Sequence, residues 1–261
     1  MNLNLQGKNA LVCGSSKGIG KAAAIEIAKL GANVTLVSRS AEIMADIVKE
    51  LDNSQGQRHD FLMANFTNSA DLKKKVLGLV SGKTIHILVN NTGGPPSGPI
   101  LEAKEMEFTQ AFHNHLICNH LLTTLITPRM IKDGYGRIIN VISTSVKAPI
   151  AGLGVSNTVR AAVANWAKTM ANELGVYGIT VNNVLPGSTI TGRIREIIQA
   201  RASKLKKTEA EIQAAMEKEI PLGRFAQAEE VGAAIAFLAS PAASYINGIN
   251  LPVDGGRTKS L

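Results

Sequence analysis

The sequence predicts an α/β fold: a single-domain, Rossmann-like, doubly wound parallel sheet of about seven strands with helices on both faces. Short apolar runs typical of buried strands alternate with helical patterns along all 261 residues, without a linker, repeat or low-complexity segment. Hydrophobic residues make up 45% of the chain and aromatic residues only 4%. A core of Ala, Val, Ile and Leu suits an interior parallel sheet covered by helices. We therefore expect one domain spanning residues 1–261.

The predicted strands are seven apolar runs. In chain order they are Ala10–Cys13, Asn33–Val37, Arg58–Met63, Ile85–Asn90, Gly136–Ser143, Ile179–Leu185 and Gly248–Val253. The segments between them carry apolar residues at the spacing of a helix. These predicted helices are Lys21–Leu30, Ala41–Leu51, Asp71–Val80, Lys104–Ile131, Asn157–Glu173 and Glu229–Ala239.

A long polar insertion, residues 190–218, separates the sixth strand from the last helix. Its apolar residues at helical spacing are Ile194, Ile197, Ile198, Ala202 and Leu205, and its basic residues include Arg193, Arg195, Arg201, Lys204, Lys206 and Lys207. One face of the segment can therefore pack while a basic face points outward. An amphipathic segment after the carboxyl end of a strand is well placed to be a mobile lid. The alternative is a solvated basic helix without a role.

The net charge of +8 favours anionic partners, such as nucleotides, acyl thioesters or nucleic acid, without choosing among them. Nucleic-acid binding is not expected, because recognised motifs are absent and the few aromatic residues offer little stacking surface. No apolar run approaches the ~18 residues that span a bilayer, and the first residues lack the apolar core of a signal peptide. Two cysteines are too few for a disulfide framework. These features predict a reduced, cytoplasmic protein without a membrane segment, and no metal site is predicted.

The turn between the first predicted strand and the first predicted helix, Cys13–Gly20, is the most informative stretch. Its glycines let the backbone approach a ligand, and the helix N-terminus offers unpaired N–H groups and a partial positive charge. The expected ligand is the pyrophosphate of a dinucleotide. The turn residues expected to hold it are Gly14, Ser16, Lys17, Gly18, Ile19 and Gly20.

A cation stands after the second strand, where an acidic residue would hold the adenosine ribose hydroxyls of NAD. Arg39 lies about 20 residues beyond Gly20, and an arginine there accommodates a 2′-phosphate instead. Lys17 adds a second cation nearby. Two cations without a carboxylate predict NADP(H) as the cofactor, and the alternative is two ordinary exposed cations.

Polar loops also follow the fourth, fifth and sixth strands: Asn90–Pro96, Ser143–Ser145 and Pro186–Thr191. Paired asparagine amides in the first of them offer hydrogen-bond donors and acceptors together. Because ligands bind beyond the carboxyl ends of the strands in such a sheet, these loops and the glycine turn should meet at one edge.

These motifs resemble those of the short-chain dehydrogenase/reductase family, from about Leu5 to Gly256. The family's Thr-Gly-x-x-x-Gly-x-Gly turn appears with Cys13 in place of Thr, and its Asn-Asn-Ala-Gly appears as Asn90–Gly93. The resemblance implies cofactor contacts for a set of residues beyond the turn: Asn65 (where the family usually has an acidic residue near the adenine), Asn91, Gly93, Arg160, Pro186, Gly187, Thr189 and Thr191. Its catalytic serine matches Ser143, and its helix-four asparagine matches Asn114.

One family motif, the catalytic Tyr-x-x-x-Lys, is replaced. At its expected position stand Ser156 and Arg160, so the predicted catalytic set is Ser143, Ser156, Arg160 and Asn114. A serine is a far weaker acid than a tyrosine, whose pKa is near ~10. The arginine keeps the positive charge and can bind the ribose, but it stays protonated and cannot be the acid.

Other proton donors can be compared by their place in the fold. Tyr135, Tyr177 and Tyr245 each precede a strand and should lie at the opposite edge of the sheet. His113 and His115 flank Asn114 and should point about 100° away on either side of a helix, so packing or exposure is the default expectation for both. A water held by Ser156 or Arg160 is a further route. Lys147 is an outside candidate.

The sequence thus predicts an NADP(H)-dependent oxidoreductase that reduces a carbonyl, or oxidises an alcohol, by hydride transfer with an atypical Ser143/Ser156/Arg160 site. By resemblance, 3-oxoacyl thioesters are a natural substrate class, although Asn172 stands where carrier-protein reductases often have an arginine. The alternative is a catalytically inactive NADP(H)-binding sensor or scaffold. The resemblance also implies a homo-oligomer, a tetramer or dimer, formed through the fourth and fifth predicted helices, Lys104–Ile131 and Asn157–Glu173.

Overall fold

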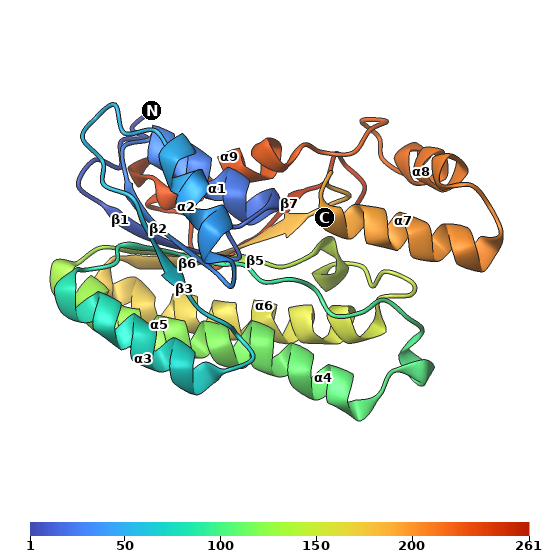
Figure 1. The fold of residues 1–261 in the computed structure, drawn as a ribbon, viewed down its shortest axis with the longest axis horizontal. Coiled ribbons are helices and arrows are strands. Elements are labelled where there is room, and N and C mark those ends of the chain that lie inside the picture. Colours follow the sequence, from blue (N-terminus) through green and yellow to red (C-terminus); the bar gives the residue numbers. More distant parts are fainter. Residues whose placement is uncertain (261) are drawn as a thin grey trace.

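The computed structural model describes residues 1–260 and has a seven-stranded, all-parallel sheet in the order β3-β2-β1-β4-β5-β6-β7 (Figure 1). The strands are β1 (Asn9–Cys13), β2 (Asn33–Ser38), β3 (Asp60–Met63), β4 (Ile87–Asn90), β5 (Gly136–Val141), β6 (Ile179–Pro186) and β7 (Asn250–Val253). The order reverses at β1, which is the point where ligands bind in doubly wound sheets. The predicted fold class is confirmed.

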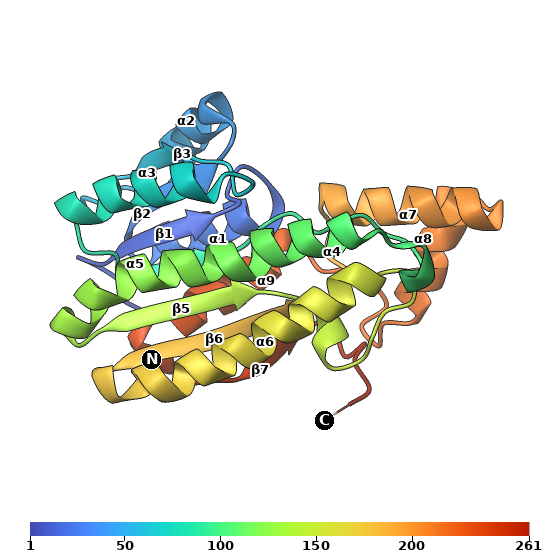
Figure 2. The same cartoon turned by 90° about the horizontal axis from the view of Figure 1, so that it is seen from below.

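Helices cover both faces of the sheet, as Figures 1 and 2 show. On one face lie α1 (Gly18–Lys29), α2 (Ala41–Glu50) and α9 (Ala228–Ala239); on the other lie α3 (Ser69–Gly82), α4 (Glu105–Phe112), α5 (Cys118–Asp133) and α6 (Gly154–Leu174). Within residues 1–260, no helix combines the length and the apolar content that a membrane crossing requires.

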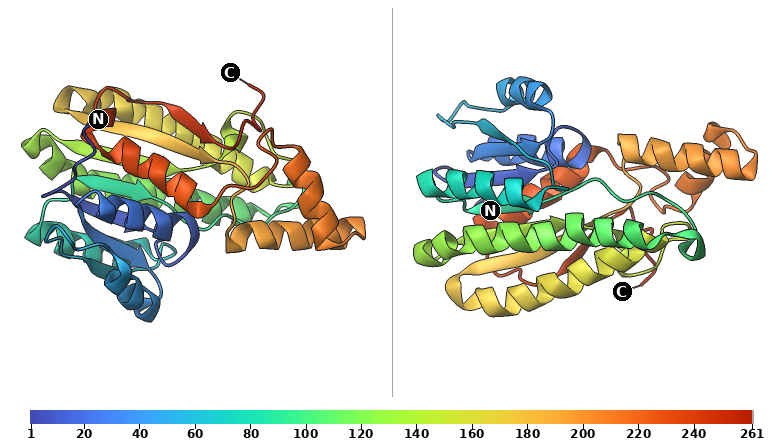
Figure 3. Two further views of the ribbon diagram at one scale, coloured as in Figure 1. Left: turned by 90° about the horizontal axis from the view of Figure 1, so that it is seen from above. Right: turned by 60° about the horizontal axis from the view of Figure 1, so that its bottom comes forward.

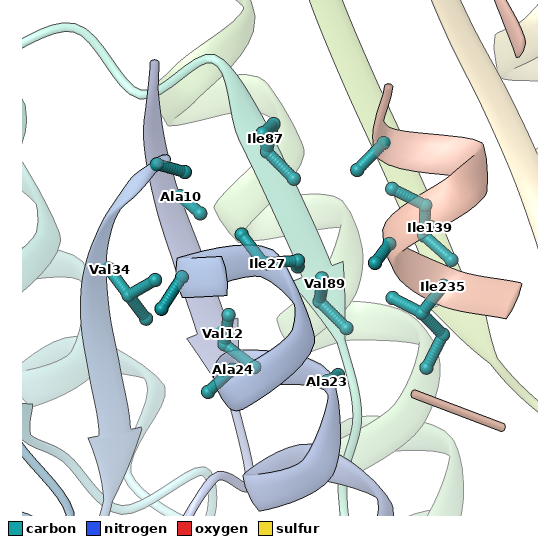
Figure 4. Packing of buried hydrophobic residues seen from close by; sticks show 14 of the residues in the cluster. Ala10, Val12, Ala23, Ala24, Ile27, Val34, Ile87, Val89, Ile139 and Ile235 are labelled. Carbon is teal, nitrogen blue, oxygen red and sulfur yellow. The ribbon is translucent and has the colours of Figure 1, made fainter. Parts of the chain in front are cut away.

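The core consists of two apolar layers, one on each face of the sheet. In the first layer, Ile27 of α1 and Ile235 of α9 are directed toward strand side chains such as Val12 and Ile139 (Figure 4). In the second, α3, α5 and α6 pack on the opposite face through residues such as Leu122. Strands buried on both faces explain the nearly continuous apolar runs in the sequence.

Four predicted strands are shorter in the structure, among them the fourth, which begins at Ile87 instead of Ile85. At the start of the run Arg58–Met63, hydrogen bonds to side chains replace the backbone hydrogen bonds between β2 and β3. Asn33 Oδ1 accepts from the Arg58 N–H, and His59 Nδ1 accepts from the Val34 N–H. Gly248, with φ +73°, keeps the start of the last run out of β7. The fifth strand ends at Val141, so Ser143 lies just beyond it.

The predicted helix Lys104–Ile131 is interrupted. Between α4 and α5 the chain forms a π-helical turn, His113–Ile117, that contains Asn114. A π turn is wider than an α turn because its hydrogen bonds run from i to i+5, and such turns are frequent at functional sites. The angular offsets expected for an ordinary helix therefore do not hold around Asn114.

The insertion forms two helices, α7 (Gly192–Leu205) and α8 (Glu209–Lys218), which project from the body of the protein at the carboxyl end of the strands (Figures 1 and 3). The pair has an apolar core of its own: Ile194, Ile198, Ala202, Ile212, Met216, Ile220 and Phe225. Leu205, expected on the packed face, is 56% exposed because the helix ends there and the chain reverses through Lys206, whose φ is +53°. We refer to residues 190–218 below as the insertion.

Candidate active site

A cavity of about 820 Å³ opens at the carboxyl-terminal edge of the sheet. The loops after β1 to β6 line it, and α7, α8 and the C-terminal Arg257 complete its wall. Its volume falls in the range of pockets that enclose a cofactor or a drug-sized ligand. The predicted convergence of separate loops at one edge is therefore present in the structure.

The glycine turn is tightly packed against the loop after β4. Gly14 and Gly18 have positive φ values of +60° and +57°, which favour glycine. A Cβ on Gly14 would lie 2.6 Å from the Asn91 backbone oxygen, and one on Gly20 would lie 2.7 Å from Asn91 Nδ2. The same Nδ2 donates to the carbonyl oxygens of Cys13 and Gly14 at 3.2 and 3.3 Å.

Among the predicted cofactor residues, Gly20 alone does not line the cavity. Because Gly20 has no side chain, the Gly14 carbonyl and the Asn91 amide fit beside it. Gly20 therefore allows the close packing of the turn and does not form part of the cavity wall. The other predicted cofactor residues line the cavity: Gly14, Ser16, Lys17, Gly18, Ile19, Arg39, Asn65, Asn91, Gly93, Arg160, Pro186, Gly187, Thr189 and Thr191.

Ser15, which the sequence analysis did not single out, ties this turn to the end of β2. Its buried Oγ accepts from the Val37 N–H at 2.9 Å, and its own N–H donates to the Val37 carbonyl at 3.3 Å. These two hydrogen bonds join the glycine turn to β2, and Lys17 on the turn and Arg39 after β2 line the same cavity. A signal was present in the sequence, since a serine in a glycine turn can bond neighbouring backbone.

Asn90 does not have the role expected of it. Instead of offering its amide to a ligand from a loop, it is the last residue of β4 and is buried. Its Nδ2 donates to Asn140 Oδ1, Asn140 donates to Asn183, and Asn183 donates to Asn250, each at 2.8 to 2.9 Å. This chain of amides crosses β4 to β7 and leaves Asn91 as the asparagine that borders the cavity.

The four predicted catalytic residues all line the cavity, from three elements. Ser143 follows β5, and its Oγ accepts the Ser145 N–H at 3.1 Å. Asn114 lies on the π turn, where its Oδ1 accepts from Gln110 Nε2 at 2.9 Å. Ser156 and Arg160 lie one turn apart on α6.

Arg160 is a buried cation, only 8% exposed. Its Nη1 donates to the Val141 carbonyl at 2.8 Å, while its Nε is buried without a hydrogen-bond partner. Burial, and secondly the positive charge of Arg193, lower the pKa of Arg160 from its ordinary value to about 10. The side chain therefore remains charged at neutral pH, with hydrogen-bonding capacity left over.

Comparison with known proteins now identifies the family. The sequence profile described as "Enoyl-(Acyl carrier protein) reductase" matches residues 14–258, nearly the whole chain. The chain belongs to the short-chain dehydrogenase/reductase family. A 3-oxoacyl-[acyl-carrier-protein] reductase FabG of Aquifex aeolicus (strain VF5) is 31% identical over 259 residues, which cover 98% of this chain and 99% of the relative. A 7alpha-hydroxysteroid dehydrogenase of Escherichia coli (strain K12) is 30% identical over 262 residues, covering 100% and 98%.

Among solved structures, an L-sorbose reductase from Gluconobacter frateurii, complexed with NADPH and L-sorbose, superposes with a TM-score of 0.92. It is 28% identical, and the match covers 100% of both chains. The relatives of this short-chain dehydrogenase/reductase are thus named as oxidoreductases, and their named substrates differ widely in shape.

The tyrosines of this short-chain dehydrogenase/reductase lie away from the cavity. The Tyr135 hydroxyl donates to the Ala239 carbonyl at 3.2 Å, Tyr177 is in a short turn before β6, and Tyr245 is fully exposed. Across residues 1–260, neither a tyrosine nor Lys147 lines the cavity wall. As the sequence analysis expected, a phenol is not within reach of the site.

His115 packs, as its default expectation allowed, and it does so against a polar partner that the sequence analysis did not name. Its ring is 3% exposed, and its Nδ1 lies 2.5 Å from Oγ1 of Thr92, which lines the cavity although His115 itself does not. His113 stays beside Cys118 and Asn114. Arg193, expected on the outward basic face of the insertion, instead lines the cavity and donates to the Pro95 carbonyl at 2.6 Å. Sequence reasoning did not consider Arg257, which the C-terminal segment brings to the same cavity.

Proposed function

We propose that the protein is an NADP(H)-dependent oxidoreductase that interconverts a carbonyl compound and an alcohol. One observation carries the proposal: a single cavity is lined by the glycine turn, by Lys17 and Arg39, and by the polar set Ser143, Ser156, Arg160 and Asn114. The residues present fit the cofactor. The glycine turn at the N-terminus of α1 suits a pyrophosphate, the two cations suit a 2′-phosphate, and the unpartnered Nε of Arg160 suits a ribose hydroxyl.

When bound, the nicotinamide supplies or takes the hydride at the substrate carbon, and the protein must manage the proton on oxygen. Ser143 Oγ accepts the Ser145 N–H, so its own O–H is available for a substrate oxygen. Arg160 adds a fixed positive charge, which stabilises negative charge that develops on that oxygen. We propose that Ser156 and Arg160 stand in place of the family's tyrosine and lysine, with Arg160 retaining only the charge.

The substrate we propose carries a negative charge, as a 3-oxoacyl thioester of a phosphate-bearing carrier does. The cavity wall within residues 1–260 contains no Asp or Glu, while six cations line it: Lys17, Arg39, Arg160, Arg193, Arg201 and Arg257. The first three are accounted for by the cofactor. Of the others, Arg193 pairs with Glu196 at 3.2 Å and Arg257 pairs with Glu219 at 2.7 Å, so their positive charge is partly offset. Arg201 of the insertion lines the same cavity as the apolar residues Ile197 and Met216, and it is the cation that most supports an anionic substrate.

The alternative, an NADP(H)-binding sensor or scaffold without catalysis, is favoured by one observation: Ser156 offers only an alkyl hydroxyl where the family has a phenol. We also propose a cytoplasmic homo-oligomer. Apolar side chains on the outer side of the α4–α5 region are partly exposed, among them Phe112 at 38%, Ile117 at 48% and Ile131 at 37%. A second copy of the chain would cover them.

NADPH oxidation against a broad panel of carbonyl compounds separates the two functions. The oxidoreductase proposal expects turnover that Ser143→Ala and Arg160→Ala each lower by at least ~10²-fold. It also expects anionic carbonyl compounds to be preferred over neutral ones of similar size. Tight NADPH binding without turnover of any compound would instead support the sensor.

A further inference from the structure

Thr92 and His115 form a hydrogen-bonded pair at the wall of the cavity. His115 Nδ1 lies 2.5 Å from Thr92 Oγ1, which is short for a hydrogen bond between these groups. Thr92 lines the cavity between Asn91 and Gly93, while His115 is buried behind it. A hydroxyl on a cavity-lining residue, backed by an imidazole, is an arrangement that can pass a proton.

The surroundings of His115 keep its imidazole neutral. Burial first, and the positive charge of Arg160 second, hold the pKa of His115 well below its usual value near 6.5; a hydrogen bond with the Gly93 backbone opposes this. From α6, the charged group facing the ring is Arg160; on its own helix, the neighbouring titratable groups are His113 and Cys118. A neutral imidazole can accept a proton at one nitrogen.

We propose that the Thr92 hydroxyl exchanges the proton with the substrate oxygen and that His115 exchanges it with Thr92, in place of the absent phenol. This inference rests on the proposed function. Thr92 is the catalytic residue in this scheme, and His115, which acts through it, is a positioning residue. Two features place the pair there: the buried position of His115 on the π turn, and a threonine where the family motif has alanine.

Alcohol oxidation to a carbonyl releases one hydride and one proton. The hydrogen on the alcohol carbon leaves with its electron pair to the oxidised nicotinamide, and the carbonyl forms as the O–H bond breaks. The hydroxyl proton passes to Thr92 Oγ1, whose own proton passes to Nδ1 of neutral His115 and gives an imidazolium. Water then removes that proton. Carbonyl reduction runs the same transfers backward and starts from the imidazolium.

The deciding experiment compares Thr92→Val, which keeps the shape and removes the hydroxyl, with Thr92→Ser, which keeps the hydroxyl. We expect Thr92→Val to lower kcat by at least ~10²-fold, with the NADPH Kd changed less than about 3-fold, and Thr92→Ser to recover most of the loss. Thr124→Val removes an exposed hydroxyl on α5 and serves as the matched control. Retention of wild-type kcat by Thr92→Val would overturn the inference.

The pH profile distinguishes a proton relay from a packing role. In the wild type, kcat for alcohol oxidation should rise with pH through a pKa below 6.5 and then level off, because His115 must be neutral to accept the proton. Carbonyl reduction should fall through the same pKa. His115→Phe, which fills the space, should remove this dependence; a profile unchanged in that variant would contradict the relay.

A measurement without turnover tests the pair itself. In cofactor-free protein, the ¹⁵N resonances of the His115 ring should titrate with a pKa below 6.5 and should shift in Thr92→Val. Ring resonances insensitive to Thr92→Val would overturn the inference by showing that the pair is absent in solution. A wild type that binds NADPH but turns over no compound overturns the relay together with the proposed function, whereas turnover that survives Thr92→Val overturns the relay alone.

Discussion

Arg160 Nη1 donates a 2.8 Å hydrogen bond to the carbonyl oxygen of Val141, the last residue of β5. The bond fixes a cation from α6 at the end of the strand that leads into Ser143. It uses one donor of a guanidinium that has five, and the Nε remains without a partner. A buried cation with donors to spare is poorly placed for stability and well placed for a ligand.

Arg160→Met is therefore expected to separate stability from binding. Burial, with the positive charge of Arg193 second, lowers the pKa of Arg160 to about 10, so below that pH these two effects destabilise the charged native state by about 3 kcal/mol. Losing the bond to Val141 costs about 1–3 kcal/mol in the opposite direction. The Tm without cofactor should match or exceed that of the wild type, while the NADPH-induced rise in Tm should shrink. Thermal unfolding with and without NADPH measures both, and a large loss of Tm without cofactor would contradict the argument.

Arg39→Asp should reverse the cofactor preference. The substitution replaces a cavity-lining cation with a carboxylate, which repels a 2′-phosphate and can accept bonds from ribose hydroxyls. We expect the Kd for NADPH to rise by about 10²-fold and the Kd for NADH to fall. Fluorescence titration with each cofactor gives both constants. Arg58→Asp makes the same charge change on an exposed residue before β3 and should leave the ratio of the NADPH and NADH Kd values unchanged. If both variants change that ratio equally, Arg39 acts only through the net charge of the protein.

Ser156→Tyr tests the position of the missing phenol. A tyrosine there would place a group of pKa near ~10 in the cavity, on the same helix as the Arg160 cation. We expect kcat for carbonyl reduction to rise and to persist at higher pH than in the wild type, since a second proton donor is added. Ser156→Phe fills the same space without a hydroxyl and should lower kcat. Equal kinetics of the tyrosine and phenylalanine variants would show that the phenol does not reach the substrate.

The sequence was sufficient for the sheet and most of the cavity wall because both depend on local patterns. Glycines in a turn, apolar runs and polar residues after strands are each visible within a few residues. The contact of Gly20 with Asn91, far apart in the chain, could be reached only as a family motif, and the structure supplies its reason. Likewise, Asn90 looked like a loop residue because its partner Asn140 comes 50 residues later.

His115 shows where such reasoning fails. Its spacing predicts packing, which the structure bears out, but the contact with Thr92 joins residues 23 positions apart and is not visible in a local pattern. Nothing in the spacing of His113–Ile117 signals a wider turn. In the insertion the helical spacing predicted the region of α7, but the break before α8 was missed for a related reason: the αL reversal at Lys206 has no glycine to mark it.

Met216 provides the test of the insertion as a lid. Its side chain is 5% exposed, packs in the separate apolar core shared by α7 and α8, and lines the cavity. Met216→Ala should loosen that small core by about 2–5 kcal/mol, which favours local opening of the two helices over global unfolding. Trypsin should then cut faster after the exposed lysines near 204–207, with little change in the Tm of the main core.

Met130→Ala is the matched control, because Met130 is fully buried in the layer beneath α3, α5 and α6. It should lower the global Tm without selectively speeding cleavage near 204–207. NADPH should slow that cleavage in the wild type, since Arg193, Ile197 and Met216 border the same cavity as the glycine turn. If NADPH does not change the cleavage rate, and if Met216→Ala and Met130→Ala raise it equally, the insertion is a solvated segment that does not close over the site.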